Sequence, residues 1–145
     1  MTWAFGPACS ENEPDVVMVG KRQQRFVAVV DDDAAVRRAT RGLLNSNGFA
    51  ARGYSSAEQL LRSGQHVGAG CLILDMRLRG MSGLKLQRRL QAAGVAIPII
   101  YCTAESDPDG CLRRPLLQAG AMAVLYKPFD PERLLRLVED ALRAG

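Results

Sequence analysis

Short, continuously apolar runs alternate with amphipathic segments from Phe26 to the end of the chain. The runs have the length of β-strands, and the segments between them repeat their apolar residues at helical spacing. Because nearly every residue of a run is apolar, rather than every second one, each strand is expected to be buried on both faces. That pattern is typical of a parallel sheet covered by helices. The alternation therefore predicts one α/β domain, and 145 residues suit a single core.

Five strands are expected, and they share apolar or branched side chains: Phe26–Val30, Phe49–Tyr54, Cys71–Leu74, Ile97–Tyr101 and Ala121–Tyr126. A helix should follow each strand: Ala34–Ser46, Ala57–Arg62, Gly83–Ala92, a segment that Pro115 interrupts or restarts, and Pro131–Arg143. Ser55 and Glu58 have the spacing of a capping box at the second helix. Right-handed crossovers then give a doubly wound (βα)5 sheet, to which we assign the flavodoxin-like strand order 2-1-3-4-5.

Residues 1–25 differ from the rest, because they contain glycine and proline but no sustained helical or strand period. We expect a disordered N-terminal tail over 1–25 and one folded domain over 26–145. Met18 lies shortly before the first strand and could serve as an alternative start. No apolar run is long enough to cross a bilayer, and no signal-peptide pattern is present, so a cytoplasmic location without membrane attachment is expected.

The formal net charge is +4, and the excess is carried mostly by arginines on the expected helices. No aromatic residues are interleaved with them, so a solvated surface is favoured over direct DNA binding. The four cysteines form no CxxC pair and lack metal-ligand spacing. Cys71 and Cys102 lie inside apolar runs and are interpreted as reduced thiols of the core.

Polar side chains follow the apolar runs at the carboxyl ends of four strands. Asp31 and Asp32 follow the first strand, Asp75 the third, Thr103 the fourth and Lys127 the fifth. Because these ends share one edge of a doubly wound sheet, the side chains are expected to meet in one pocket. Carboxylates crowded together need a cation, and Mg²⁺ suits ligands that are all oxygen. A carboxylate beside Mg²⁺, with a lysine and a hydroxyl, can accept a phosphoryl group.

The ordered segments resemble the receiver domain of response regulators over about residues 26–143. The segments that carry the resemblance are Val29–Asp33, Leu72–Asp75, Gly80–Leu84, Ile99–Ala104 and Ala119–Phe129. The resemblance implies that Asp75 is the phosphoacceptor and that Asp31 and Asp32 bind Mg²⁺ with it. It further implies the backbone carbonyl of Arg77 as a metal ligand, Thr103 and Lys127 as contacts of the phosphoryl group, and a cis Lys127–Pro128 bond.

Three features depart from the pattern of this family. Leu78-Arg79 stands where receivers usually have Met-Pro, so a rigid turn residue is missing. The switch position, an aromatic three residues before the lysine, is Val124 here. The segment 105–120 is about two residues longer than is typical and contains Pro115, so an irregular fourth helix is expected.

Two charged residues flank the predicted site. In receivers, the residues two after the phosphoacceptor and two after the threonine border the path of the water that removes the phosphoryl group. Here they are Arg77 and Glu105, whose charges are opposite. We predict that they form an ion pair across the mouth of the site and modulate dephosphorylation of Asp75.

The chain ends directly after its fifth expected helix, which suggests a stand-alone receiver. The resemblance implies a sensor histidine kinase or a histidine phosphotransfer protein as phosphodonor. It also implies a downstream protein partner, is compatible with a dimer linked to phosphorylation, and indicates a switch rather than an enzyme.

Two alternatives remain. A receiver-like module could bind its partner without phosphorylation. A phosphatase of the haloacid dehalogenase type could use Asp31–Asp33, although Ala35 stands where its motif has Thr or Val.

Overall fold

A computed structural model describes residues 25–144. The predicted tail and the alternative start at Met18 lie outside the described residues, apart from Arg25. Five parallel strands form one sheet in the order β2-β1-β3-β4-β5, which confirms the predicted topology. The strands are β1 (Phe26–Val30), β2 (Ala51–Tyr54), β3 (Ala69–Asp75), β4 (Ile99–Thr103) and β5 (Ala123–Tyr126).

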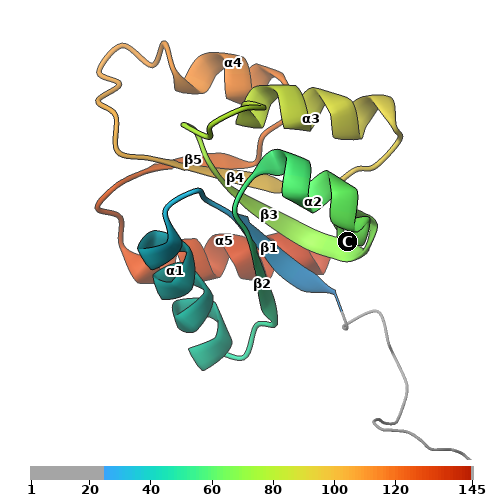
Figure 1. The fold of residues 1–145 in the computed structure, drawn as a ribbon. Helices are drawn as coiled ribbons and strands as arrows, with labels where there is room; N and C mark the ends of the chain where they lie inside the picture. The colour runs from blue at the N-terminus through green and yellow to red at the C-terminus, as the bar shows by residue number, and fades with distance from the viewer. Residues whose placement is uncertain (1–24, 145) are drawn as a thin grey trace, which may run out of the picture.

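Helices cover both faces of the sheet (Figure 1). They are α1 (Ala34–Ser46), α2 (Ala57–Ser63), α3 (Gly83–Ala92), α4 (Arg113–Gln118) and α5 (Pro131–Ala144), with a short 3-10 helix, η2 (Gln65–Gly68), before β3. In Figure 1, α1 and α5 lie on one face, and α2, α3 and α4 lie on the other. Each face has its own apolar core, because alternate strand residues such as Val29 and Val30 point to opposite sides.

Some boundaries differ from the sequence prediction, and hydrogen bonding explains the differences. Strand β2 begins at Ala51 because the N–H of Phe49 donates to Leu44 O and so belongs to the end of α1. Strand β4 begins after Pro98 and continues to Thr103, which is therefore part of the strand. Pro115 does not interrupt α4, since it lies in the first turn, where the N–H groups have no partner within a helix.

The predicted capping box at α2 is wrong. Ser56 is the N-cap, and its hydroxyl accepts from the N–H of Gln59 over 3.0 Å. The side chain of Gln59 accepts in turn from the N–H of Ser55. Glu58 is therefore free to reach across to the loop after β3, where its Oε2 accepts from the N–H of Met81 over 3.0 Å.

The two cysteines of the apolar runs lie where the sequence predicted. Cys71 and Cys102 are free, buried thiols, and burial raises the pKa of each to about 12. They therefore act as small apolar core residues at neutral pH. Among residues 25–144, no helix is both long and apolar enough to span a membrane.

Candidate functional site

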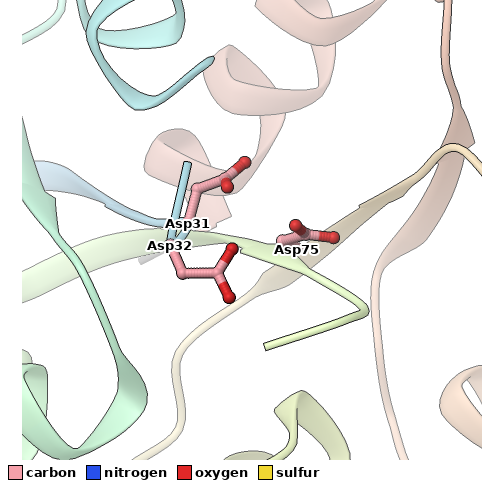
Figure 2. Close-up of side chains that lie close together, drawn as sticks. All are labelled: Asp31, Asp32 and Asp75. Atoms are coloured by element: carbon pink, nitrogen blue, oxygen red, sulfur yellow. The ribbon is translucent and has the colours of Figure 1, made fainter. Parts of the chain in front are cut away.

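Three carboxylates meet at the carboxyl edge of the sheet. Val30 lies opposite Leu74 in the register of β1 and β3, so the residues that follow them, Asp31 and Asp75, emerge side by side. Asp32 comes next in the chain. One carboxylate oxygen from each of the three lies within 4.8 Å of the others, and Figure 2 shows the side chains extending from the two neighbouring strand ends. The convergence follows from the strand order, since β1 and β3 are neighbours in the sheet.

Asp31 is the most buried member of this acidic trio, with 5% of the residue exposed. Burial raises the pKa of its carboxyl above the usual value, and the charges of Asp75 and Asp32 act in the same direction. Two contacts oppose the increase: the N–H of Asp33 donates to Asp31 Oδ1 over 2.9 Å, and Lys127 Nζ lies 3.7 Å from Asp31 Oδ2. A buried carboxyl crowded by two others favours a cation, so this all-oxygen donor set fits Mg²⁺.

Asp33 has a different role from its two predecessors. It is the N-cap of α1, and its Oδ1 accepts from the N–H groups of Ala35 and Val36. Its carboxylate is thereby used to begin a helix. A phosphatase of the haloacid dehalogenase type would need the carboxylates of both Asp31 and Asp33 at its reaction centre. Because the Asp33 carboxylate caps α1, the structure argues against this alternative.

Thr103 and Lys127 come together on the other side of the trio. Thr103 is fully buried at the end of β4, and its Oγ1 accepts from the N–H of Glu105 over 3.0 Å. The N–H of Lys127 donates to Thr103 O over 2.7 Å, and the Lys127–Pro128 peptide bond is cis, as the resemblance implied. A cavity of about 120 Å³ lies beside these residues, and Asp31, Asp75 and Lys127 are among the residues that line it.

The structure contains the ion pair that the sequence predicted between Arg77 and Glu105. Arg77 Nε lies 2.5 Å from Glu105 Oε2, and the two side chains come from the loops after β3 and β4. The Arg77 side chain is 74% exposed, so the pair itself contributes little to stability. Its effect on dephosphorylation stays a prediction.

The position of the family's aromatic switch holds an aliphatic residue, Val124, which is partly buried against the core beneath α4. Tyr101 on β4 is fully buried, and its hydroxyl donates to Gln87 Oε1 over 2.8 Å. Tyr126, two residues after Val124, is partly exposed, and its hydroxyl donates to Asp107 Oδ2 over 2.7 Å. Of these two tyrosines, Tyr126 is therefore the one whose hydroxyl bonds to the β4–α4 loop.

Asp107 is the centre of that loop. Its carboxylate accepts from the N–H groups of Leu112 and Arg113 over 3.0 and 3.1 Å, in addition to the hydroxyl of Tyr126. The pKa of Asp107 is lowered: desolvation acts against the decrease, but these hydrogen bonds and the charge of Arg113 outweigh it. One carboxylate thus ties the start of α4 to the end of β5.

Comparison with known proteins identifies the family. The response regulator receiver domain matches residues 27–139. The chain belongs to this family. It is 38% identical over 121 residues to the response regulator protein TmoT of Ectopseudomonas mendocina, covering 83% of this chain and 54% of the relative. It is 33% identical over 117 residues to the transcriptional regulatory protein FixJ of Bradyrhizobium diazoefficiens, covering 81% and 56%. The receiver chain thus spans about half the length of these relatives.

Solved structures show the same fold. The response regulator StyR is 41% identical, with a TM-score of 0.74 over 83% of this chain and 60% of that one. FixJ-N is 32% identical, with a TM-score of 0.75 over 83% of this chain and 95% of that one. Receiver domains serve phosphorelay signalling in two-component systems, generally as phosphoacceptor switches, and they bind Mg²⁺ at an acidic pocket. They interact with histidine kinases or phosphotransfer proteins.

Three residues around this receiver site make contacts that the sequence pattern does not predict. Arg79 was noted as a departure, and its N–H lies 3.3 Å from Asp32 Oδ2. The sequence predicts Glu58 as part of a capping box and Tyr126 as the end of the fifth strand. The one available signal was the unusual residue at the position of Arg79, where the family has proline.

Proposed function

We propose that this protein is a phosphorylation switch in which Asp75 accepts a phosphoryl group. The donor would be a phosphohistidine of a sensor histidine kinase or of a histidine phosphotransfer protein. The observation that carries the proposal is the convergence of Asp31, Asp32 and Asp75 within 4.8 Å, beside a lysine that is 3.7 Å from Asp31. Asp75 is the last residue of β3 and is partly exposed, so a donor can approach it from outside the sheet edge.

The transfer would form a bond between a carboxylate oxygen of Asp75 and phosphorus while the bond from phosphorus to the donor's histidine nitrogen breaks. Mg²⁺ held by the acidic trio and the backbone carbonyl of Arg77 would neutralise the developing charge on the phosphoryl oxygens. The Lys127 ammonium would pair with one of these oxygens. The Thr103 hydroxyl, whose oxygen already accepts from Glu105 N–H, would donate its own proton to another.

Phosphorylation would change the surface that a downstream protein or a second copy of the chain recognises. We propose signalling by protein–protein contact for the described domain and a cytoplasmic location, both on the ground of the family. Turnover of a separate substrate is not part of this proposal. The alternative is a receiver-like module that binds its partner without phosphorylation, and Val124 at the switch position is the feature that favours it.

Labelling with acetyl phosphate tests the proposal. The purified protein is incubated with acetyl phosphate and Mg²⁺, and its intact mass is compared with that of a sample containing a chelator. We expect an adduct of about 80 Da that requires Mg²⁺. A folded protein that acquires no adduct would support the phosphorylation-independent module, and hydrolysis of a small phosphate ester with turnover would support the phosphatase.

A further inference from the structure

Arg79 makes two contacts with the metal-site carboxylate of Asp32. Its backbone N–H donates to Asp32 Oδ2 over 3.3 Å, and its Nε lies 3.7 Å from the same oxygen. A proline at this position would have neither an amide hydrogen nor a charge, so both contacts depend on the residue that this chain carries. We propose that Arg79 is a tethered counter-cation that competes with Mg²⁺ for Asp32. This inference rests on the proposed Mg²⁺ site.

The charges of the site support this role. Lys127 Nζ lies 3.7 Å from Asp31 Oδ2, and Arg79 Nε lies at the same distance from Asp32 Oδ2. Each of the two carboxylates after β1 thus has a cation of the chain beside it. Three carboxylates with Lys127 alone would leave a formal charge of two negatives, whereas Arg79 reduces it to one. A less negative site attracts a divalent cation less strongly.

The loop that carries Arg79 is held on both sides of it. Asp75 Oδ1 accepts from the N–H of Arg77 over 3.1 Å, and Glu58 Oε2 accepts from the N–H of Met81 over 3.0 Å. These anchors hold the Arg79 backbone beside Asp32. The Arg79 side chain is 95% exposed, however, so the guanidinium can swing into solvent while the backbone stays in place.

The backbone N–H and the guanidinium of Arg79 therefore have different roles. The N–H of Arg79 donates to Asp32 Oδ2 and keeps the carboxylate oriented. The guanidinium is the part that an incoming Mg²⁺ displaces. Its departure removes a cation from the site when the metal arrives. Arg79 therefore sets how much free Mg²⁺ the protein needs before Asp75 can be phosphorylated.

Calorimetric titration of the metal-free protein with Mg²⁺ measures this competition directly. Arg79→Gln removes the charge and keeps the backbone N–H. The matched control is Arg89→Gln, which removes the same charge from the last turn of α3, at the opposite end of that helix from the site. We expect Arg79→Gln to lower the Mg²⁺ dissociation constant about two- to fivefold at low ionic strength, the range for an exposed ion pair. Arg79→Lys should stay close to wild type.

Salt provides a second readout. Exposed charges are screened over about 8 Å at physiological ionic strength, so the difference between Arg79→Gln and wild type should narrow as salt is added. In an NMR spectrum, the Nε–H signal of Arg79, assigned by its loss in Arg79→Gln, should shift during the Mg²⁺ titration.

The outcomes separate this inference from the proposed function. Equal dissociation constants for wild type and Arg79→Gln would overturn the role of Arg79 and leave the Mg²⁺ site intact. An equal gain in Arg89→Gln would also overturn it, since any lost positive charge would then have the same effect. If neither wild type nor Arg79→Gln binds Mg²⁺, the proposed Mg²⁺ site itself fails, and the inference fails with it.

Discussion

The two sides of the receiver site are built in different ways. The carboxylate side consists of Asp31, Asp32 and Asp75, at the ends of β1 and β3. The other side, called the switch side here, consists of Thr103 and Lys127 at the ends of β4 and β5, with Val124, Tyr126 and Asp107 nearby. The first depends on where neighbouring parallel strands end, and that follows from the register Val30↔Leu74. The second depends on which side chains pack between β5, α4 and the β4–α4 loop.

Each of the two sides contains one departure from the family pattern. The carboxylate side has the three carboxylates that the proposed Mg²⁺ site needs, and its unusual neighbour, Arg79, adds contacts to Asp32. On the switch side, the aromatic position is Val124, while Tyr126 is tied to Asp107. The contribution of each side can therefore be tested with variants on that side alone.

The largest effect is expected from Asp75→Asn. This substitution removes the carboxylate that we propose as the nucleophile and keeps an oxygen that can accept from the N–H of Arg77. The variant should acquire no Mg²⁺-dependent adduct of about 80 Da from acetyl phosphate, as measured by intact mass. An undiminished adduct would show that another residue is the phosphoacceptor and would break the assignment of the carboxylate side.

Asp31→Asn combined with Asp32→Asn should also abolish Mg²⁺-dependent labelling, because most of the charge that holds the ion is lost. Without metal, the same variant should be more stable than wild type at neutral pH. The raised pKa of Asp31 means that its contribution to stability is complete below the unfolded value, near 3.8, and is lost as the pH rises through the folded value. Asparagine has no carboxyl to ionise, so the variant does not lose this stability as the pH rises.

Thermal unfolding in the presence of a chelator measures that second effect. The melting temperature of the variant should exceed that of wild type by a margin that grows from acid to neutral pH. Asp33→Asn is a control, since its side chain caps α1 and can still accept from Ala35 N–H. A margin that does not depend on pH would show that ionisation of the buried Asp31 carboxyl, beside two other carboxylates, is not its cause.

The ion pair between Arg77 and Glu105 joins the two sides, and its effect should be on rate. Arg77→Ala should accelerate the loss of phosphate from Asp75 severalfold, because the long side chain no longer excludes water. Adding Glu105→Ala should give a non-additive result, since residues in contact couple. Dephosphorylation of the single variants and the double variant is followed at fixed Mg²⁺. Strictly additive rates would mean that the two residues act independently.

The smallest effect is expected from Tyr126→Phe, which removes the hydroxyl that donates to Asp107. The loss should be about 0.5–1.5 kcal/mol in the free energy of unfolding, the usual contribution of one hydrogen bond. Hydrogen exchange should rise at the amides of Leu112 and Arg113, which donate to the same carboxylate.

Tyr54→Phe is the matched control for this substitution. Tyr54 is the last residue of β2, at the opposite edge of the sheet from β5, and the substitution removes its hydroxyl, which donates to Gln65. It should cost comparable stability without changing exchange at Leu112 and Arg113. If both variants change exchange there to the same extent, the tie between Tyr126 and Asp107 has no special connection with the switch side.

The sequence by itself determined the fold and the carboxylate side. Continuously apolar runs specify buried parallel strands, and the polar residue at the end of each run must then lie at the carboxyl edge. The order of these residues also identified the family and placed Arg77 and Glu105 close enough to pair, as the structure shows. These inferences depend on backbone geometry, which short patterns specify well.

Tertiary structure alone decided the contacts of Arg79, Glu58 and Tyr126. Glu58 has good capping spacing, yet it anchors the loop after β3 because α2 lies beside that loop. Tyr126 bonds to Asp107, and Arg79 contacts Asp32, although the members of each pair are too far apart in the sequence for a local pattern to link them. The physical reason is that an exposed or partly exposed side chain bonds whichever partner the folded loops bring within reach, and a short sequence pattern does not specify how those loops are arranged.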